Sequence, residues 1–515
     1  MVKYQIDIAF PGAVLKGPWR AFHNILLLRA GLFFLKEDSG SDRHTLPPNY
    51  QSAYHYITKF ASHTFNELVK NIDAEISPFF SSEELNQLAR ESKFVQRESK
   101  IDGSVFLDLI VFNSENLKEE SLNDLSIELM IRHGIEIKKQ SLHERFNNYA
   151  VAFLKNALEQ LLRNQLGDEI ALGKFERINR ILIKDSVCFQ ISESLAEHYP
   201  GSGGSGSGAA VRIQFEYDLL TGIINDLSIN AFNDQDAVNS VDTIELTKQG
   251  DLIIRDLAYM NLKTLRLIAS NLAYYLCRTG SQVNVYELRG DHFEKICFRK
   301  LAKGMKKLNL DMTEKEVFVG DKEMIRVRLI VHLMPEKEVE KRLRKARANN
   351  KKKGRGNLSK EFVARAGLNL FITNTSQEQV PAENVWFLYR LRWQIELMFK
   401  IWKSICKIDT VKKVNKYRLE CHIFAKLIFI ILGWQIIWKV AKNLFVNEAK
   451  ALSFFKAFKT LFRGITDLRN VFVLKKEPVE TFMKKFYEIS RTNHLLEKRK
   501  KELTSMEILQ SCLTI

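Results

Sequence analysis

The sequence predicts a mixed α/β chain of several domains, and three observations support this fold class. A chain of 515 residues with 45% apolar content is long enough to form three or more domains or subdomains. Runs rich in β-branched residues between about 178 and 375 are typical of strands. Before and after them, apolar residues recur at three- and four-residue steps, which is typical of helices.

The charge balance indicates a polyanionic partner. Lys and Arg total 78 against 61 Asp and Glu, so the formal net charge is +17 and the isoelectric point is near 9.4. This excess favours nucleic acid first and an anionic membrane second, because charge fixes the sign of a partner and not the chemistry. The six cysteines lack a C-x-x-C pair, which argues against a zinc site or a disulfide framework and fits a reducing cytosol.

We expect no segment to cross a membrane. The apolar run 25–35 is interrupted by Arg29 and no small-residue cleavage site follows it, so it is not a clean signal peptide. The apolar run 423–439 contains Lys426 and Gln435, and we expect it to form a buried helix. The sequence therefore predicts a cytoplasmic protein.

The N-terminal part is expected to be helical after a poorly defined start. Residues 1–60 contain Gly, Pro and Ser clusters that are typical of loops. Residues 61–170 carry apolar side chains at helical spacing, and we expect a helical DNA-binding domain there. Within this domain, residues 121–154 predict a helix, a turn and a second helix.

The predicted helix-turn-helix has specific end signals. Ser121 can cap the first helix, and Gly134 can end it. Lys139 and Arg145 load the start of the second helix with positive charge, which a recognition helix needs near a phosphate-lined groove. The alternative is a basic helix end that simply faces solvent.

Residues 171–278 are expected to form the first part of a core that carries two acids on its strands. The predicted strands are 180–191, 211–219, 222–232 and 251–259, followed by a helix at 261–272. Asp185 lies within the first strand and Asp256 at the end of the fourth. Three meandering strands, a short helix, a strand and a helix give the order of a ribonuclease-H-like fold, in which acids occupy these two places.

The stretch from Tyr389 to Lys403, YRLRWQIELMFKIWK, contains no Pro or Gly and predicts a single helix. At about 100° per residue, Tyr389, Arg392, Glu396 and Lys403 share an arc of about 60°. Most of the remaining circumference is apolar, so we expect a buried helix whose polar stripe faces a cleft. Helical geometry alone supports a solvated stripe on an amphipathic helix equally well.

The spacing Y-(2)-R-(3)-E-(6)-K of these four residues resembles the signature of a subgroup of bacterial insertion-sequence transposases, which are cut-and-paste enzymes of the DDE class. Asp185 and Asp256 also resemble the family in their local sequence. The resemblance implies that Asp185, Asp256 and Glu396 together hold two Mg²⁺ ions, for which Mn²⁺ can substitute, with Asp185 between the ions.

The resemblance also implies the partners. Tyr389, Arg392 and Lys403 would hold the DNA strand near the cleaved end, and Arg278 resembles a family position near DNA. The implied substrate is double-stranded DNA, both the transposon terminal repeats and the target. Two ends normally need two subunits, so we expect a homodimer in the synaptic complex, associated with the nucleoid.

Residues 279–375 exceed what the bare fold requires and resemble the family's β-rich insertion, which contacts transposon ends. QVNVYEL, KICFRKL and MIRVRLIVHLM are its strand candidates. The run from Lys341 to Arg355 carries nine Lys or Arg and no acid. It is either a solvated, disordered face or an arm that folds on DNA phosphates.

Residues 376–445 are expected to complete the ribonuclease-H-like core with the signature helix, and 446–515 to form a helical C-terminal region. The predicted function is a DDE transposase that cleaves transposon ends and joins their 3′-hydroxyls to target DNA. Two alternatives remain open from the sequence. One is an inactive, transposase-derived DNA-binding protein, and the other is a metal-dependent nuclease without strand transfer.

Overall fold

A computed structural model of the chain describes residues 65–113, 121–165, 177–202, 208–233, 243–256, 261–279, 283–321, 324–411, 413–497, 504–505 and 507–508. Residues 69–515 form one compact unit, and the fold described below is that of this unit. The expectation for residues 1–60 lies outside the described residues.

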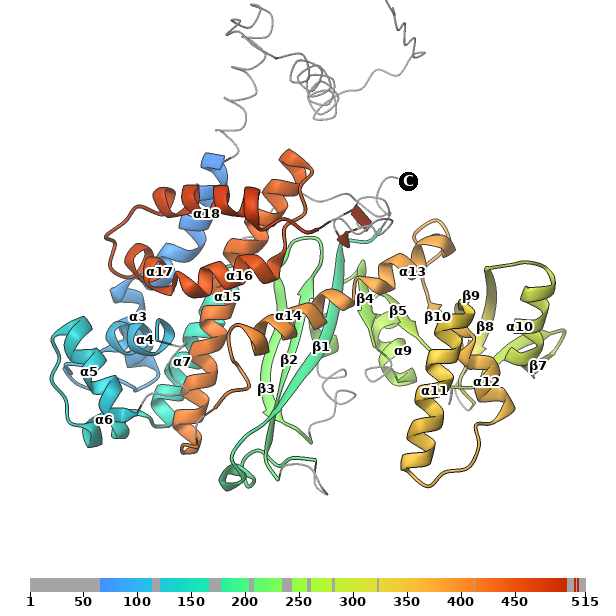
Figure 1. Cartoon of the computed structure of the whole chain (residues 1–515), viewed down its shortest axis with the longest axis horizontal. Coiled ribbons are helices and arrows are strands. Elements are labelled where there is room, and N and C mark those ends of the chain that lie inside the picture. Colours follow the sequence, from blue (N-terminus) through green and yellow to red (C-terminus); the bar gives the residue numbers. More distant parts are fainter. Residues whose placement is uncertain are drawn as a thin grey trace, which may run out of the picture. The chain divides into compact units, whose positions relative to one another are not determined.

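Among the described residues, ten strands form one sheet flanked by helices, which makes this a mixed α/β fold (Figure 1). The strands are β1 (Arg180–Gln190), β2 (Ala210–Asp218), β3 (Ile224–Ala231), β4 (Asp251–Arg255), β5 (Tyr274–Arg278), β6 (Val285–Arg289), β7 (His292–Lys295), β8 (Met312–Val319), β9 (Ile325–Leu333) and β10 (Leu368–Thr373). The helices are α3 (Ser82–Glu91), α4 (Gly103–Val111), α5 (Leu122–His133), α6 (Lys139–Arg145), α7 (Asn148–Arg163), α9 (Leu262–Ser270), α10 (Phe298–Lys307), α11 (Glu336–Lys352), α12 (Lys360–Ala366), α13 (Ala382–Arg390), α14 (Trp393–Ser404), α15 (Lys416–Glu448), α16 (Phe454–Arg463), α17 (Ile465–Phe472) and α18 (Val479–Asn493).

The strand order is β3-β2-β1-β4-β5-β10-β9-β8-β6-β7. β1 runs parallel to β4, and β4 runs parallel to β5, whereas β2 is antiparallel to both β1 and β3. The four predicted core strands and the helix after them are confirmed as β1 to β4 and α9. In the turn between β2 and β3, Gly222 has a φ of +75° and lies against the indole of Trp438, so a side chain there would be strained and crowded.

Residues 279–375 extend the same sheet. β10 pairs with β5 and β9 pairs with β10, so the strands of this stretch continue the core edge to edge. The prediction of a strand at KICFRKL is wrong, because α10 begins at Phe298. Phe298 and Met305 bury one face of this helix while Lys300 and Lys303 stay exposed, so the helical period decides its conformation. β8 was not predicted.

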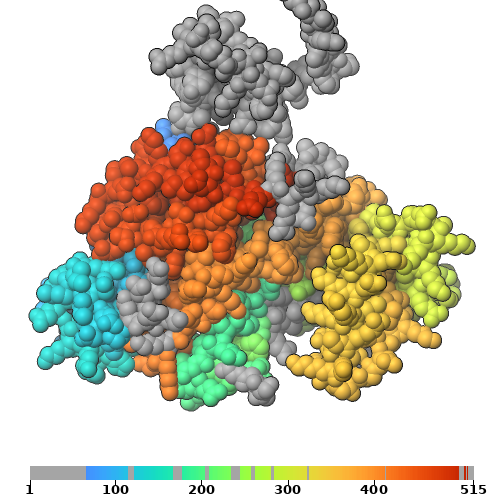
Figure 2. Space-filling view, in the orientation of Figure 1, coloured from blue at the N-terminus to red at the C-terminus, as the bar shows by residue number. Residues whose placement is uncertain are grey.

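The basic run from Lys341 is helical up to Lys352, within α11. Its interpretation as a disordered face is therefore wrong in conformation, although the expected exposure is confirmed, since no residue of α11 is buried. Ala, Glu, Lys and Arg favour a helix, and Glu336 and Glu338 stabilise its N-terminal turn. Figure 2 shows α11, in yellow, on the surface of the face in view.

The predicted helix, turn and second helix are confirmed as α5, the turn at Gly134 and α6, but the second helix is shorter than predicted. α5 begins with Ser121, which forms a capping box, and ends at Gly134 with a φ of +66°. The second helix stops at Arg145, because the Asn147 side chain accepts hydrogen bonds from two N–H groups that follow it and caps a new helix, α7.

The stretch predicted as one helix forms two, α13 and α14. At their junction, the N–H of Arg392 bonds to the carbonyl of Tyr389 and the N–H of Ile395 bonds to the carbonyl of Arg392, both at 3.2 Å. These bonds span three residues instead of four, so the backbone tightens into a 3₁₀ turn at the signature residues. α13 packs against β5 and α14 packs against β1.

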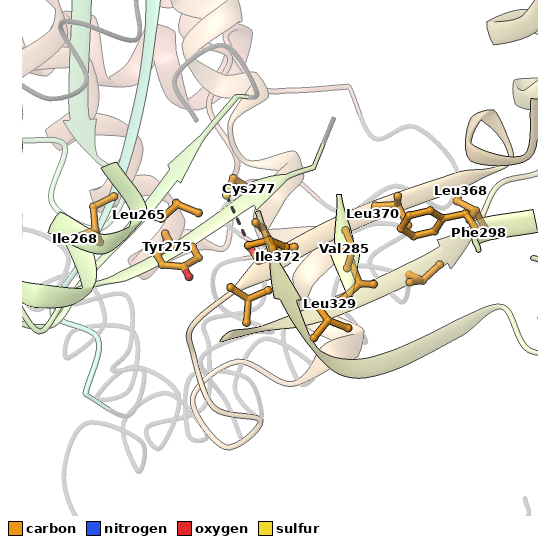
Figure 3. Close-up of a cluster of buried hydrophobic side chains, with 14 of the residues drawn as sticks. Leu265, Ile268, Tyr275, Cys277, Val285, Phe298, Leu329, Leu368, Leu370 and Ile372 are labelled. Atoms are coloured by element: carbon orange, nitrogen blue, oxygen red, sulfur yellow. Dashed lines mark hydrogen bonds between the residues drawn. The ribbon is translucent and has the colours of Figure 1, made fainter. Parts of the chain in front are cut away.

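One hydrophobic layer serves both the core strands and the inserted strands (Figure 3). It joins side chains of β4, β5, β9 and β10 with those of α9 and α10. Figure 3 shows Leu265 and Tyr275 near one end of this layer and Leu368 and Phe298 near the other. The insertion is therefore held to the core by shared apolar burial as well as by strand pairing.

The apolar run 423–439 lies within α15, which is long and apolar enough to cross a membrane by length and composition. However, 94% of its most apolar window is buried inside the protein, so the predicted buried helix is confirmed. Trp434 and Trp438 pack edge-on against Tyr217 of β2, and the Trp434 indole donates to the carbonyl of Gly222 at 2.8 Å. α15 thus covers the β2–β3 end of the sheet.

Candidate active site

Two acidic residues lie side by side on neighbouring parallel strands. Asp185 is in the middle of β1, and Asp256 directly follows β4. The register pairs Lys184 with Arg255, so the next positions along, Asp185 and Asp256, are adjacent across the sheet. Parallel pairing of these two strands is what brings two carboxylates from separate parts of the chain together.

The junction of α13 and α14 brings a third acid to them. Nη1 of Arg392 donates to Oδ2 of Asp185 at 3.2 Å, and Nη2 donates to Oε1 of Glu396 at 2.6 Å. The hydroxyl of Tyr389 donates to Oδ1 of Asp256 at 3.2 Å. All three predicted acids therefore meet around two signature side chains.

Burial and competing charges together set the electrostatics of this cluster. Burial raises the pKa of Asp185 to about 6, and the charges of Asp256 and Glu396 act in the same direction, against a backbone hydrogen bond and Arg392. Burial lowers the pKa of Arg392, but Tyr389, Asp256 and Glu396 together raise it above its usual value. One arginine does not neutralise this cluster.

The donor set suits a hard divalent cation. Carboxylate oxygens are the ligands that such ions prefer, and a bound cation would offset both the burial of Asp185, which is the main cause of its raised pKa, and the charges of Asp256 and Glu396. Within the described residues, no three His, Cys, Asp or Glu side chains are close enough to hold an ion, and here the guanidinium of Arg392 lies between Asp185 and Glu396. The residues fit a cation in chemistry and charge, while Arg392 bridges two of them.

Arg278, which is predicted to contact DNA, lies beside this cluster. It ends β5 and, with Tyr389 and Arg392, lines a cavity of about 820 Å³. Its Nη2 reaches Oδ1 of Asn369 at 3.5 Å. Tyr389 and Arg392 thus face a hollow, as predicted for the polar stripe, whereas Glu396 and Lys403 of the same stripe do not line it.

Lys403 is the signature residue that lies apart from the acids. Its Nζ donates to the carbonyl of Cys188 on β1 at 2.9 Å, three residues beyond Asp185. It therefore adds positive charge along the same strand and does not contact the carboxylates.

The two predicted DNA-binding residues of the helical region lie on α6. Lys139 is exposed at the start of this helix. Arg145 is half-buried, hydrogen-bonded to Ser99 and placed over the ring of Phe94, 5.8 Å from its centroid. Of the pair, only Lys139 is fully presented to solvent.

Two charged residues directly precede the acids, Lys184 before Asp185 and Arg255 before Asp256, and neither was predicted to belong to the site. Both point to the opposite face of the sheet and are buried. The available signal was a charged residue inside an apolar strand, one position before an acid, repeated in two strands.

Comparison with known proteins identifies the class. The family described as Transposase DDE domain matches residues 176–432, which include all three acids. The chain is 32% identical over 398 residues to the transposase for insertion sequence element IS231F of Bacillus thuringiensis subsp. israelensis, covering 74% of this chain and 83% of the relative. It is 29% identical over 412 residues to that for IS1151 of Clostridium perfringens, covering 77% and 86%.

A solved structure of the piggyBac transposase synaptic complex with hairpin DNA covers 84% of this chain and 86% of its own, at 10% identity and a TM-score of 0.40. Similarity at that level does not by itself establish a common fold. The sequence relatives do establish the family: the chain belongs to the DDE transposases of bacterial insertion sequences. Its function is that of such an enzyme, which cleaves transposon-end DNA and joins the ends to target DNA, and enzymes of this class use divalent metal ions.

Proposed function

We propose that Asp185, Asp256 and Glu396 are the catalytic acids of this transposase and that they hold two Mg²⁺ ions, for which Mn²⁺ can substitute. The observation that carries this proposal is the double contact of Arg392 with Asp185 and Glu396, because it joins residues 207 positions apart in the chain at one point. When bound, the ions activate water and stabilise the leaving oxygen. Asp185 lies beside Asp256 on the neighbouring strand and shares Arg392 with Glu396, so it would hold the ions together with both other acids.

The signature residues bind and orient the cleaved strand. Arg392 offers a planar donor set that suits a phosphate, and its buried Nε has no hydrogen-bond partner among the described residues. Burial raises the pKa of Tyr389, so its hydroxyl stays protonated and donates. Lys403 adds a point charge further along β1.

We also infer a ribonuclease-H-like core and membership of the subgroup with the Tyr-Arg-Glu-Lys signature. The strand order β3-β2-β1-β4-β5, antiparallel in its first half and parallel in its second, supports a ribonuclease-H-like core. The contacts of Tyr389 and Arg392 with the acids support membership of the subgroup with the Tyr-Arg-Glu-Lys signature.

The partner is double-stranded DNA, as terminal repeats and as target, bound by a homodimer in the cytoplasm at the nucleoid. Lys139, Arg145 and Arg278 contribute to this binding. The support is electrostatic: the chain carries a net charge of +17, and the lysines and arginines of α11 are exposed except for the half-buried Arg342.

The test is cleavage and joining of a plasmid that carries the terminal sequences of this element, in Mg²⁺. Asp185→Ala, Asp256→Ala and Glu396→Ala should each abolish nicking and joining while still binding the ends. Asp291→Ala, an exposed acid between β6 and β7, is the matched control and should behave as wild type. Normal nicking by Asp185→Ala would refute the assignment, and cleavage without joining of pre-cleaved ends would identify a nuclease.

A further inference from the structure

A row of four charged side chains crosses the sheet on the face opposite the proposed catalytic acids. The register aligns Arg255 on β4, Lys184 on β1, Glu216 on β2 and Asp226 on β3. Lys184, Glu216 and Arg255 are 0%, 1% and 4% exposed. We call these four residues the charge row. Charged side chains buried to this degree are rare in proteins and have to be paired.

The pairing within the charge row is interleaved. Like charges stand next to each other, Arg255 beside Lys184 and Glu216 beside Asp226. Each cation therefore reaches past its neighbour to an anion two strands away. Nη2 of Arg255 donates to Oε1 of Glu216 at 2.8 Å, and Nζ of Lys184 donates to Oδ2 of Asp226 at 2.7 Å.

This arrangement fixes how four strands lie relative to one another. The Arg255–Glu216 pair spans β4, β1 and β2, and the Lys184–Asp226 pair spans β1, β2 and β3. A slip of one residue in any of these strands would move a charged side chain to the other face and leave its partner buried alone. Apolar residues would avoid the desolvation cost of the charges but would not penalise a slip in this way.

The charge row is also directly connected to the acids through the backbone. Lys184 immediately precedes Asp185, and Arg255 immediately precedes Asp256. Successive side chains of a strand point to opposite faces, so fixing residues 184 and 255 on one face fixes where 185 and 256 emerge on the other. The two strands that carry the acids are the two that carry the cations.

We propose that the charge row positions Asp185 and Asp256 for metal binding from behind the sheet. Its members are positioning residues, because they act through the strands and lie on the opposite face from the metal. The inference rests on the proposed function of the two acids and names the residues that hold their geometry.

The chain contains a matched control on the same two strands and the same face. Arg180 of β1 and Asp251 of β4 are paired in register at the other end of these strands. Nη2 of Arg180 bonds to Oδ2 of Asp251 at 2.6 Å, and Asp251 is fully buried. This pair resembles the charge row in kind but lies four residues before it along each strand.

The experiment compares Lys184→Met/Asp226→Asn with Arg180→Met/Asp251→Asn, since each double substitution removes both members of an ion pair. The probes are Ca²⁺ alone, followed by its effect on thermal unfolding, and Mg²⁺ in end cleavage well below both unfolding temperatures. We expect the first variant to need about 10- to 100-fold more of either ion, while binding end DNA as wild type. We expect the second variant to be less stable with an unchanged ion requirement.

Wild-type ion requirements in Lys184→Met/Asp226→Asn would overturn the inference, and so would an equal shift in both variants. If the first variant does not fold, Glu216→Asp takes its place, because it keeps the negative charge but moves it away from Arg255. It must then show the same increase in ion requirement. A wild-type ion requirement in Glu216→Asp would overturn the inference. Lys184→Arg, which keeps the charge, should restore ion binding. If Asp185→Ala loses cleavage but Lys184→Met/Asp226→Asn keeps the wild-type ion requirement, only this inference fails. If Asp185→Ala cleaves normally, the proposed function on which the inference rests fails.

Discussion

Two aspartates, Asp108 and Asp185, each meet an arginine from a distant part of the chain, and the electrostatic results are opposite. Asp108 on α4 accepts three hydrogen bonds from Arg469 of α17 at 2.7 to 3.0 Å and lies 2.8 Å from Nε2 of His133. Burial raises the pKa of Asp108, but these partners outweigh burial and hold it below its usual value. Asp185 meets Arg392 at 3.2 Å and keeps a pKa raised to about 6.

The difference separates a carboxylate whose charge is balanced from the one that we propose to be catalytic. The charge of Asp108 is balanced by its neighbours, so its role is to tie α4 to α17. Asp185 is buried beside two other acids and Arg392 does not offset this burial, so its charge is costly unless a further cation binds. The same residue type, with the same kind of partner, thus supports stability at Asp108 and, under our proposal, chemistry at Asp185.

The largest effect should come from Asp185→Asn. End cleavage should fall by about 10³-fold or more, because a metal ligand at the reacting phosphate is lost. The unfolding temperature without metal should not fall, because the removed charge was unbalanced. Rates of cleavage with saturating Mg²⁺ and a thermal melt in chelator measure the two quantities. A variant that cleaves well, or that melts much earlier than wild type, would break the contrast with Asp108.

Asp108→Asn should do the reverse. It leaves Arg469 without its anion, so the free energy of unfolding should fall by about 3 kcal/mol at neutral pH, while cleavage per folded molecule stays unchanged. Denaturant unfolding and the fraction of active molecules measure this. A loss of activity in folded Asp108→Asn would show that the two aspartates are not separate in role.

The stability loss in Asp108→Asn should depend on pH with a defined sign. The folded-state pKa of Asp108 is lowered, so its ionised form stabilises the fold above the unfolded-state pKa of about 4. This contribution disappears as the pH falls through the folded-state pKa. The difference between wild type and variant should therefore close in acid, and a difference that widened in acid would contradict the pairing.

Arg392→Lys tests the contacts of Arg392 with Asp185 and Glu396, and its effect on cleavage should be smaller than that of Asp185→Asn. Lysine keeps the charge but cannot reach two carboxylates and a phosphate with a planar donor set. We expect end cleavage to fall by about 10- to 100-fold with folding intact, as measured by initial rates and a thermal melt. Arg463→Lys, exposed on α16 and not part of the cavity lining, is the control and should cleave normally.

The smallest effect should come from removing single exposed positive charges of α11, which lie away from the proposed catalytic acids. Lys345→Gln or Arg347→Gln on α11 should weaken DNA binding and reduce the slope of log affinity against log salt by about 1 each. Lys484→Gln, exposed on α18, is the control for charge alone. Equal salt slopes for the α11 variants and for Lys484→Gln would mean that α11 does not contact the DNA backbone.

Features set by neighbouring residues, such as the strands that carry the acids, were predicted from the sequence. Features set by pairing between distant strands were not. The alternation around Asp185 and the apolar run before Asp256 predicted their strands, and the spacing of Arg392 and Glu396 predicted that they lie together, because each pattern spans only a few consecutive residues. The 3₁₀ turn at Arg392 was not predicted, since no Gly or Pro marks it. Lys184 lies beside Glu216 only because of the register between β1 and β2, and this register cannot be read from the sequence.

Binding of Mn²⁺, followed by its paramagnetic resonance in the absence of DNA, tests most directly whether three acids share one metal site. Asp185→Asn, Asp256→Asn and Glu396→Gln should each weaken the same binding event by at least about tenfold, and Asp108→Asn should bind as wild type does. Wild-type Mn²⁺ binding in any of the first three variants would contradict a common site.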